Sequence, residues 1–136
     1  MTYLLDTNIV SQTAKLHPDP AVMHWWQQQD EFSLMVSAIA FQELRFGIES
    51  MSQGKKRDRL EEWLESLRRE FVGRILPVTE EVAEVSGVLL AGTKQAGHMA
   101  EVADALIAAT AQVHGMVVAT LNWKHFEPLG VELVEF

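Results

Sequence analysis

Short apolar segments alternate along this chain with longer segments that have helical spacing. The segments expected to form strands are rich in aliphatic, aromatic and β-branched residues, and they are 2–5, 32–36, 74–78, 116–119 and 131–134. Strands that alternate with helices pair in parallel, because each helix carries the chain back to the same edge of the sheet. The sequence therefore predicts an α/β fold with a short, mostly parallel central sheet flanked by helices on both faces.

The segments between these strands carry helix signals. Thr7 or Asn8 is expected to cap a helix that runs towards Lys15, and Ser37 to cap a later one. Other expected helices begin near residue 21 or occupy 55–70, 80–95 and 101–113, with a single turn at 123–126. In open parallel sheets, functional sites form beyond the carboxyl ends of the strands, so the residues that follow each strand are of most interest.

Length and composition set the class of protein. A chain of 136 residues with 48% apolar residues is expected to form a single domain, 1–136. No apolar stretch approaches the ~20 residues that a membrane span needs, and the N-terminus has no basic leader. The chain has no cysteine, which suits a reducing compartment and leaves only oxygen or imidazole groups to hold a metal. We expect a cytoplasmic protein without a membrane role.

The charge distribution narrows the possible partners. A formal net charge of -8 argues against a surface that attracts nucleic acid everywhere, because phosphate binding needs clustered Lys and Arg. Seven of the 11 basic residues nevertheless lie between Lys55 and Arg74. Acidic residues are interleaved with them, which favours a solvated helix with internal salt bridges over a basic flank. Nucleotide-binding and esterase motifs of the P-loop, G-x-G-x-x-G and G-x-S-x-G types are absent.

Three acidic residues stand in apolar surroundings. Asp6 follows the first apolar strand, Glu43 lies among small and apolar residues of a helix, and Asp104 lies within VADALIAATA. Isolated carboxylates are costly to bury unless they are paired or bind a cation. A shared Mg²⁺ would remove that cost, because this ion prefers oxygen ligands and keeps several waters.

Each of these acids also has an ordinary structural interpretation. Asp6 suits a turn or a helix cap, and Asp104 suits the first turn of a helix, where the dipole favours an acid. Glu43 suits a salt bridge with Arg45 or Arg69. Taken one at a time, the three positions leave these alternatives open.

Four sequence blocks combine these positions. They are, in order, YLLDTNIVS, SAIAFQELRFGI, VADALIAATAQVHG and VVATLNWKHFEPLGVEL, and together they resemble the signature blocks of PIN-domain toxins of the VapC type. The resemblance implies an endoribonuclease that requires Mg²⁺ or Mn²⁺, is usually dimeric and is held inactive by a cognate antitoxin. The acids of that family fall on Asp6, Glu43 and Asp104, which it implies are catalytic metal ligands.

The chain departs from the family at a fourth position. Many relatives carry an acid in the last block, where TLNWKHF places Asn122 and His125. Asn122 can position water but adds no charge, so we expect it to be a catalytic contact without being a metal ligand. Three anionic ligands should weaken binding of a second metal, and one-metal and two-metal catalysis both remain open. For His125, a capping or packing role is preferred to metal or phosphate contact.

We therefore expect the toxin of a type II toxin–antitoxin pair, a homodimeric endoribonuclease that hydrolyses RNA phosphodiesters with metal-activated water. The cluster of acids would also attract an Arg side chain of the antitoxin. The alternatives are a protein-binding module that lost its chemistry together with the fourth acid, and a nuclease that prefers DNA. The sequence does not identify the RNA target, because RNA specificity comes from shape and loops.

Overall fold

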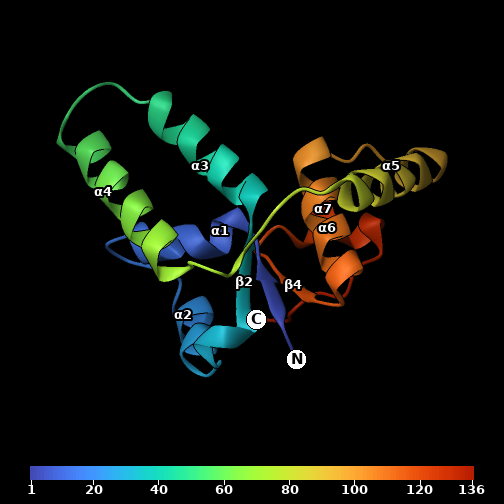
Figure 1. Ribbon diagram of the computed structural model, residues 1–136, viewed down its shortest axis with the longest axis horizontal. Helices are drawn as coiled ribbons and strands as arrows, with labels where there is room; N and C mark the ends of the chain where they lie inside the picture. The colour runs from blue at the N-terminus through green and yellow to red at the C-terminus, as the bar shows by residue number, and fades with distance from the viewer.

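A computed structural model describes residues 1–136, and a sheet of four parallel strands lies at its centre (Figure 1). The strands are β1 (Tyr3–Leu5), β2 (Leu34–Ser37), β3 (Ile75–Leu76) and β4 (Val117–Ala119), in the order β3-β2-β1-β4. In the register of the sheet, Leu5 of β1 pairs with Val36 on one side and with Ala119 on the other. The predicted parallel α/β architecture is confirmed.

Helices cover both faces of this sheet (Figure 1). The first group lies on one side, and its members are α1 (Thr7–Val10), η1 (Ser11–Ala14), α2 (Pro20–Gln27), η2 (Glu31–Ser33), α3 (Ala38–Glu49) and α4 (Lys55–Glu70). The second group lies on the other side, and its members are α5 (Glu80–Gln95), α6 (Val102–His114), α7 (Trp123–Phe126) and η3 (Glu127–Leu129). No helix is both long and apolar enough to span a bilayer.

The alternation of side chains along β1 explains the two layers. Leu5 belongs to a hydrophobic cluster that includes Leu64 and Phe71 of the first group. Its neighbour Leu4 belongs to a second cluster, with Ile107 of α6. Successive side chains of a strand point to opposite faces, so even a three-residue strand joins both halves of the core.

The ends of several elements differ from the sequence prediction. Residues 131–134 form no strand, and only an isolated bridge joins Leu133 to Val118. The cap of α1 is Asp6, whose carboxylate accepts a hydrogen bond from the Thr7 amide, so the prediction of Thr7 or Asn8 is wrong. The prediction of Ser37 as the cap of α3 is confirmed, because its hydroxyl accepts from the Ile39 amide.

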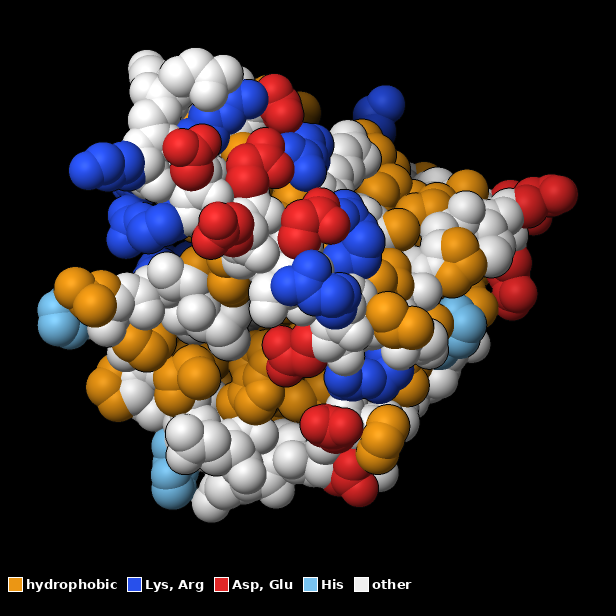
Figure 2. Space-filling model, turned by 60° about the vertical axis from the view of Figure 1, so that its left-hand side comes forward, with side chains coloured by type: hydrophobic (Ala, Val, Ile, Leu, Met, Phe, Trp, Pro, Cys, Tyr) orange, Lys and Arg blue, Asp and Glu red, His pale blue; other side chains and the backbone are white.

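The charged helix α4 makes most of its ion pairs with α3 rather than within itself. The Arg45 guanidinium lies 2.8 Å from Glu61, and the Arg57 guanidinium lies 2.8 Å from Glu49. Within α4, Arg68 pairs with Glu65. Figure 2 shows basic and acidic side chains mixed over the face that this helix occupies, with apolar side chains gathered beside them. The prediction of a solvated helix is confirmed, but its salt bridges chiefly connect two helices.

Candidate active site

Three acids from distant parts of the chain meet beyond the carboxyl ends of β1, β2 and β4. Asp6 follows β1 directly, Glu43 lies on the helix that follows β2, and Asp104 lies in the first turn of α6. All three line one depression of about 380 Å³, together with Asn122 and His125. The structure thus brings together the residues that the sequence singled out.

Asp6 is a buried carboxylate with two fixed hydrogen bonds. Only 3% of the Asp6 surface is exposed to solvent. Its Oδ1 accepts from the Thr7 amide at 2.8 Å and its Oδ2 accepts from the Thr120 hydroxyl at 2.7 Å. The pKa of Asp6 is raised to about 6, chiefly by burial and further by the charges of Asp104 and Glu43, although the two hydrogen bonds act to lower it. Asp6 therefore combines a capping role with the electrostatics of a cation site.

Glu43 is held by a hydroxyl rather than by a basic residue. The Thr7 hydroxyl donates to its Oε1 at 2.6 Å, which ties α3 to the start of α1. Arg45 instead points to Glu61 and Glu49, so the alternative of an Arg45 salt bridge to Glu43 is wrong. The Glu43 carboxylate lines the depression beside Asp6 and Asp104.

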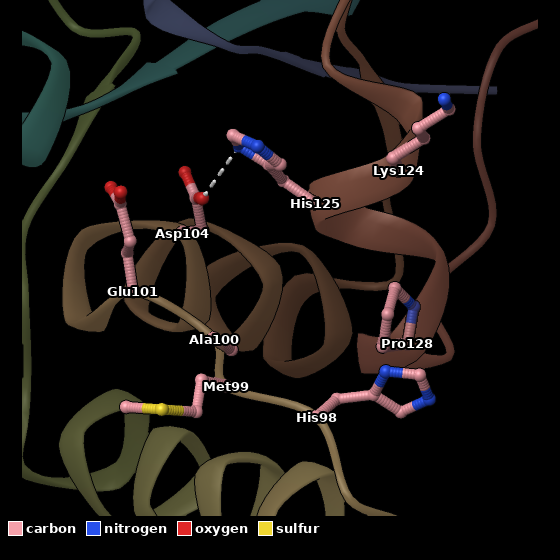
Figure 3. A pocket seen from close by; sticks show the side chains of 8 residues that line it. All are labelled: His98, Met99, Ala100, Glu101, Asp104, Lys124, His125 and Pro128. Carbon is pink, nitrogen blue, oxygen red and sulfur yellow. Dashed lines mark ion pairs between the residues drawn. The ribbon is translucent and has the colours of Figure 1, made fainter.

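Asp104 is the third carboxylate of the depression and is 7% exposed. Burial raises its pKa, and the nearby charges of Glu101 and Glu43 raise it further, whereas His125 lowers it. Figure 3 shows the His125 ring turned towards Asp104, and its Nδ1 lies 3.5 Å from Oδ2. The His125 side chain is 55% exposed, so the predicted packing role is wrong.

The loop after β4 is fastened to the start of α1. The Leu121 amide donates to Asn8 Oδ1 at 3.1 Å, and the Asn122 amide donates to the Thr120 hydroxyl at 2.9 Å. These bonds place Asn122 on the rim of the acidic depression. A neutral amide there contacts solvent beside the carboxylates.

A smaller pocket of about 170 Å³ adjoins the acidic depression and shares Glu101, Asp104 and His125 with it (Figure 3). The pocket adds His98, from the segment between α5 and α6, and Lys124 of α7. Sequence reasoning missed Glu101, although its spacing of three residues before Asp104 places the two acids on the same side of a helix start. No linear pattern marked His98 or Lys124.

The donor set suits a hard cation with a partial shell of water. In the described residues 1–136, no group of three or more His, Cys, Asp or Glu side chains is gathered closely enough to hold a metal by itself. Magnesium commonly takes one or two carboxylates and keeps several waters, so it does not require such a group. The oxygen ligands, the raised pKa of Asp6 and the open depression fit such an ion.

A parallel sheet with converging carboxylates at its carboxyl edge defines an α/β protein with an acidic centre. The model of the PIN domain family matches residues 3–129, and the chain belongs to that family.

Relatives and solved structures agree with this assignment. The chain is 38% identical over 132 residues to VapC ribonuclease Y4jK of Sinorhizobium fredii, which covers 96% of this chain and 94% of the relative. It is 39% identical over 124 residues to toxin FitB of Neisseria gonorrhoeae, covering 90% and 89%. The crystal structure of FitAcB from Neisseria gonorrhoeae superposes with a TM-score of 0.90 at 36% identity, covering 98% of this chain and 97% of that one.

Proposed function

We propose that this protein is a metal-dependent endoribonuclease that acts as the toxin of a type II toxin–antitoxin pair. The observation that carries the proposal is the convergence of Asp6, Glu43 and Asp104 on one depression. The likeness to a protein named VapC ribonuclease supports RNA as the substrate. The likeness to toxin FitB supports the biological class.

Asp6, Glu43 and Asp104 would hold Mg²⁺ or Mn²⁺, directly or through waters. When bound, the ion supplies positive charge for the phosphodiester and a water whose pKa is lowered. The protein supplies the positions of the ligands. The Thr120 hydroxyl orients Asp6 and the Thr7 hydroxyl orients Glu43, so each carboxylate is held before substrate arrives.

Asn122 and His125 complete the rim of the depression in this proposal. Asn122 offers an amide that donates to, or accepts from, a water beside the scissile phosphate. His125 lies against Asp104 and faces the opening, where its ring limits how the RNA backbone enters. The chain therefore has three anionic positions and a neutral fourth one.

The antitoxin would inhibit this site by placing a positively charged side chain among its carboxylates. Two buried carboxylates with raised pKa attract a basic side chain, and an Arg guanidinium can bond a carboxylate through two nitrogens. Solved structures of FitAB bound to an IR36 DNA fragment and of FitAcB support a toxin that works with a partner. An antitoxin-bound structure without a basic side chain near Asp6 or Asp104 would contradict this.

The proposal includes a homodimer. Val88 on α5 is 71% exposed, Val102 at the start of α6 is 62% exposed, and Met99 in the segment between these helices is 101% exposed. Exposed apolar side chains on one helical pair favour burial against a second copy. Analytical ultracentrifugation of wild type and of Val88→Asp should show a dimer and a monomer, respectively. A monomeric wild type at micromolar concentration would remove the dimer from the proposal.

The test of the activity is cleavage of a mixed RNA panel, including transfer RNA, with Mg²⁺, Mn²⁺ or EDTA. Asp6→Asn and Asp104→Asn should abolish cleavage, because each removes an anionic position. Glu84→Gln, an exposed acid on α5, removes the same charge away from the depression and should leave the rate unchanged. Parallel DNA substrates separate a ribonuclease from a DNA nuclease.

Each result decides between the candidate functions. Metal-dependent RNA cleavage that both site variants lose supports the ribonuclease. Cleavage of DNA in preference to RNA would reassign the substrate. Purified protein that binds its partner but cleaves neither nucleic acid with either metal would support a binding module.

A further inference from the structure

A groove runs from the acidic depression along α3 and α4. It has a volume of about 610 Å³ and lies between the η1 segment and these two helices. Ser11, Glu43 and Leu44 line both the groove and the acidic depression, so the two hollows are continuous. A polymer bound at the carboxylates can therefore extend into the groove without leaving the surface.

Three basic side chains line this groove. They are Lys15, which follows η1, and Lys56 and Arg59, which lie three residues apart on the same side of α4. All three are exposed, and none forms an ion pair within 4.0 Å, although Arg45, Arg57 and Arg68 all do. On a protein with a net charge of -8, three free cations along one groove are a local site for anions.

The wall between the cations is apolar and contains an aromatic ring in a fixed position. Trp63 lines the groove, and its indole nitrogen donates to the Thr13 hydroxyl at 2.9 Å. Leu16 lines the groove as well and is 90% exposed. Bases of an unpaired strand stack on such surfaces, whereas the bases of a duplex are already stacked on each other.

We propose that this groove is the track for a single-stranded segment of RNA on one side of the cleaved bond. Lys15, Lys56 and Arg59 contact its phosphates, and the apolar wall with Trp63 contacts its bases. The proposal rests on the ribonuclease function and adds the path of the substrate, which runs from the carboxylates along the groove beside α3 and α4. Charge complementarity and continuity with the carboxylates favour RNA over a polypeptide as the occupant.

The test is RNA binding measured without cleavage. Fluorescence anisotropy follows a labelled, unstructured RNA oligomer in EDTA, across a range of salt concentrations. The variant is the full chain with Lys56→Gln and Arg59→Gln. The matched control carries Arg69→Gln and Lys94→Gln, which remove one Arg and one Lys that do not line the groove.

Counterion release sets the expected result. Each lost phosphate contact on a single strand lowers the slope of log affinity against log salt by about 0.7, so the groove variant should lose about 1.4. At 0.1 M salt this corresponds to about a 25-fold loss of affinity. The control should keep the wild-type slope, and duplex RNA of the same sequence should bind more weakly than the single strand.

The contrary outcomes are distinct. A groove variant with the wild-type slope, or a wild type that binds no single-stranded RNA at low salt, overturns the proposal and leaves the groove to a polypeptide partner. Cleavage assays on the same proteins separate this failure from that of the function. If wild type cleaves RNA while the groove variant binds normally, the ribonuclease stands and the track does not.

Discussion

Burial of the charged Asp6 carboxylate lowers the stability of the fold when no cation is present. Its pKa is raised from 3.8 to about 6, chiefly by burial, so the folded state holds this proton more tightly than the unfolded state. Burial of Asp6 therefore does not lower the free energy of unfolding at pH values below about 4. The penalty grows as the pH rises from about 4 to 6 and is complete above that, at up to about 3 kcal/mol.

The Asp6→Asn variant should remove this penalty. In EDTA at pH 8 we expect it to unfold with a free energy about 1–3 kcal/mol higher than wild type, and at pH 4 we expect no gain. Urea unfolding at pH 4, 6 and 8 measures the difference, and Asp58→Asn on the exposed face of α4 is the control. A variant that is less stable than wild type at pH 8 would show that the capping hydrogen bonds outweigh desolvation.

Thr120 affects the pKa of Asp6, and a substitution at this position can measure that effect. Its hydroxyl donates to Asp6 and thereby lowers the pKa of that carboxyl. In Thr120→Val the pKa of Asp6 should rise, because the charged carboxylate loses a hydrogen bond worth about 1.5–3 kcal/mol. The acid limb of the pH profile of kcat/KM should move to higher pH. The plateau of kcat/KM above this limb should change less than the rate on the limb itself. An acid limb at the wild-type position would exclude Asp6 as the titrating group.

At the scale of elements, Arg74 joins the end of α4 to the sheet. It is 8% exposed, and its guanidinium donates to the backbone carbonyls of Leu34 and Glu70, each at 2.8 Å, and to that of Glu31. It also lies over the Phe71 ring, with 4.4 Å between the guanidinium carbon and the ring centroid. A single side chain thus connects the last residue of α4 to the first residue of β2.

Replacing Arg74 with Met should therefore destabilise the fold by about 2–4 kcal/mol, because buried carbonyls lose a charged donor. Arg68→Met removes a solvent-exposed pair with Glu65 and should cost much less stability than the loss of Arg74. Thermal and urea unfolding of the two variants give the comparison. Equal losses would mean that the carbonyls around Arg74 are satisfied by solvent.

The elements whose bounds could be predicted from the sequence are long helices, in which apolar residues recur over several turns. The helices 55–70 and 80–95 match the predicted bounds because each repeats its apolar spacing over several turns. Short strands lack this repetition, so 131–134 was predicted as a strand although it forms only a bridge. The cap of α1 was also displaced by one residue, since Asp6, Thr7 and Asn8 all have capping side chains.

At the scale of the whole molecule, the acidic centre was predictable because parallel topology gathers the ends of distant strands at one edge. Asp6 and Asp104 needed only a strand end and a helix start to be placed. The basic groove was not predictable in this way. Lys15 and Arg59 line the same groove because α4 lies beside η1, where Trp63 donates to Thr13, and no spacing along the chain encodes that contact.

The net charge of -8 and the buried carboxylates together predict how metal affects stability. Binding of Mg²⁺ to the folded state alone stabilises it by about 1.4 kcal/mol when its concentration is ten times the dissociation constant. For a chain of this length the unfolding temperature should rise by about 3–6 °C. Differential scanning fluorimetry with and without Mg²⁺ at pH 8 gives the shift.

Variants assign this shift to the acidic depression. Asp104→Asn should abolish the Mg²⁺ shift, because it removes one of the three anionic positions, whereas Glu84→Gln should retain it. A shift of equal size in both variants would mean that Mg²⁺ only screens the overall negative charge. Screening of that kind would also follow the ionic strength of a monovalent salt, so a matched NaCl series distinguishes it from occupation of the site.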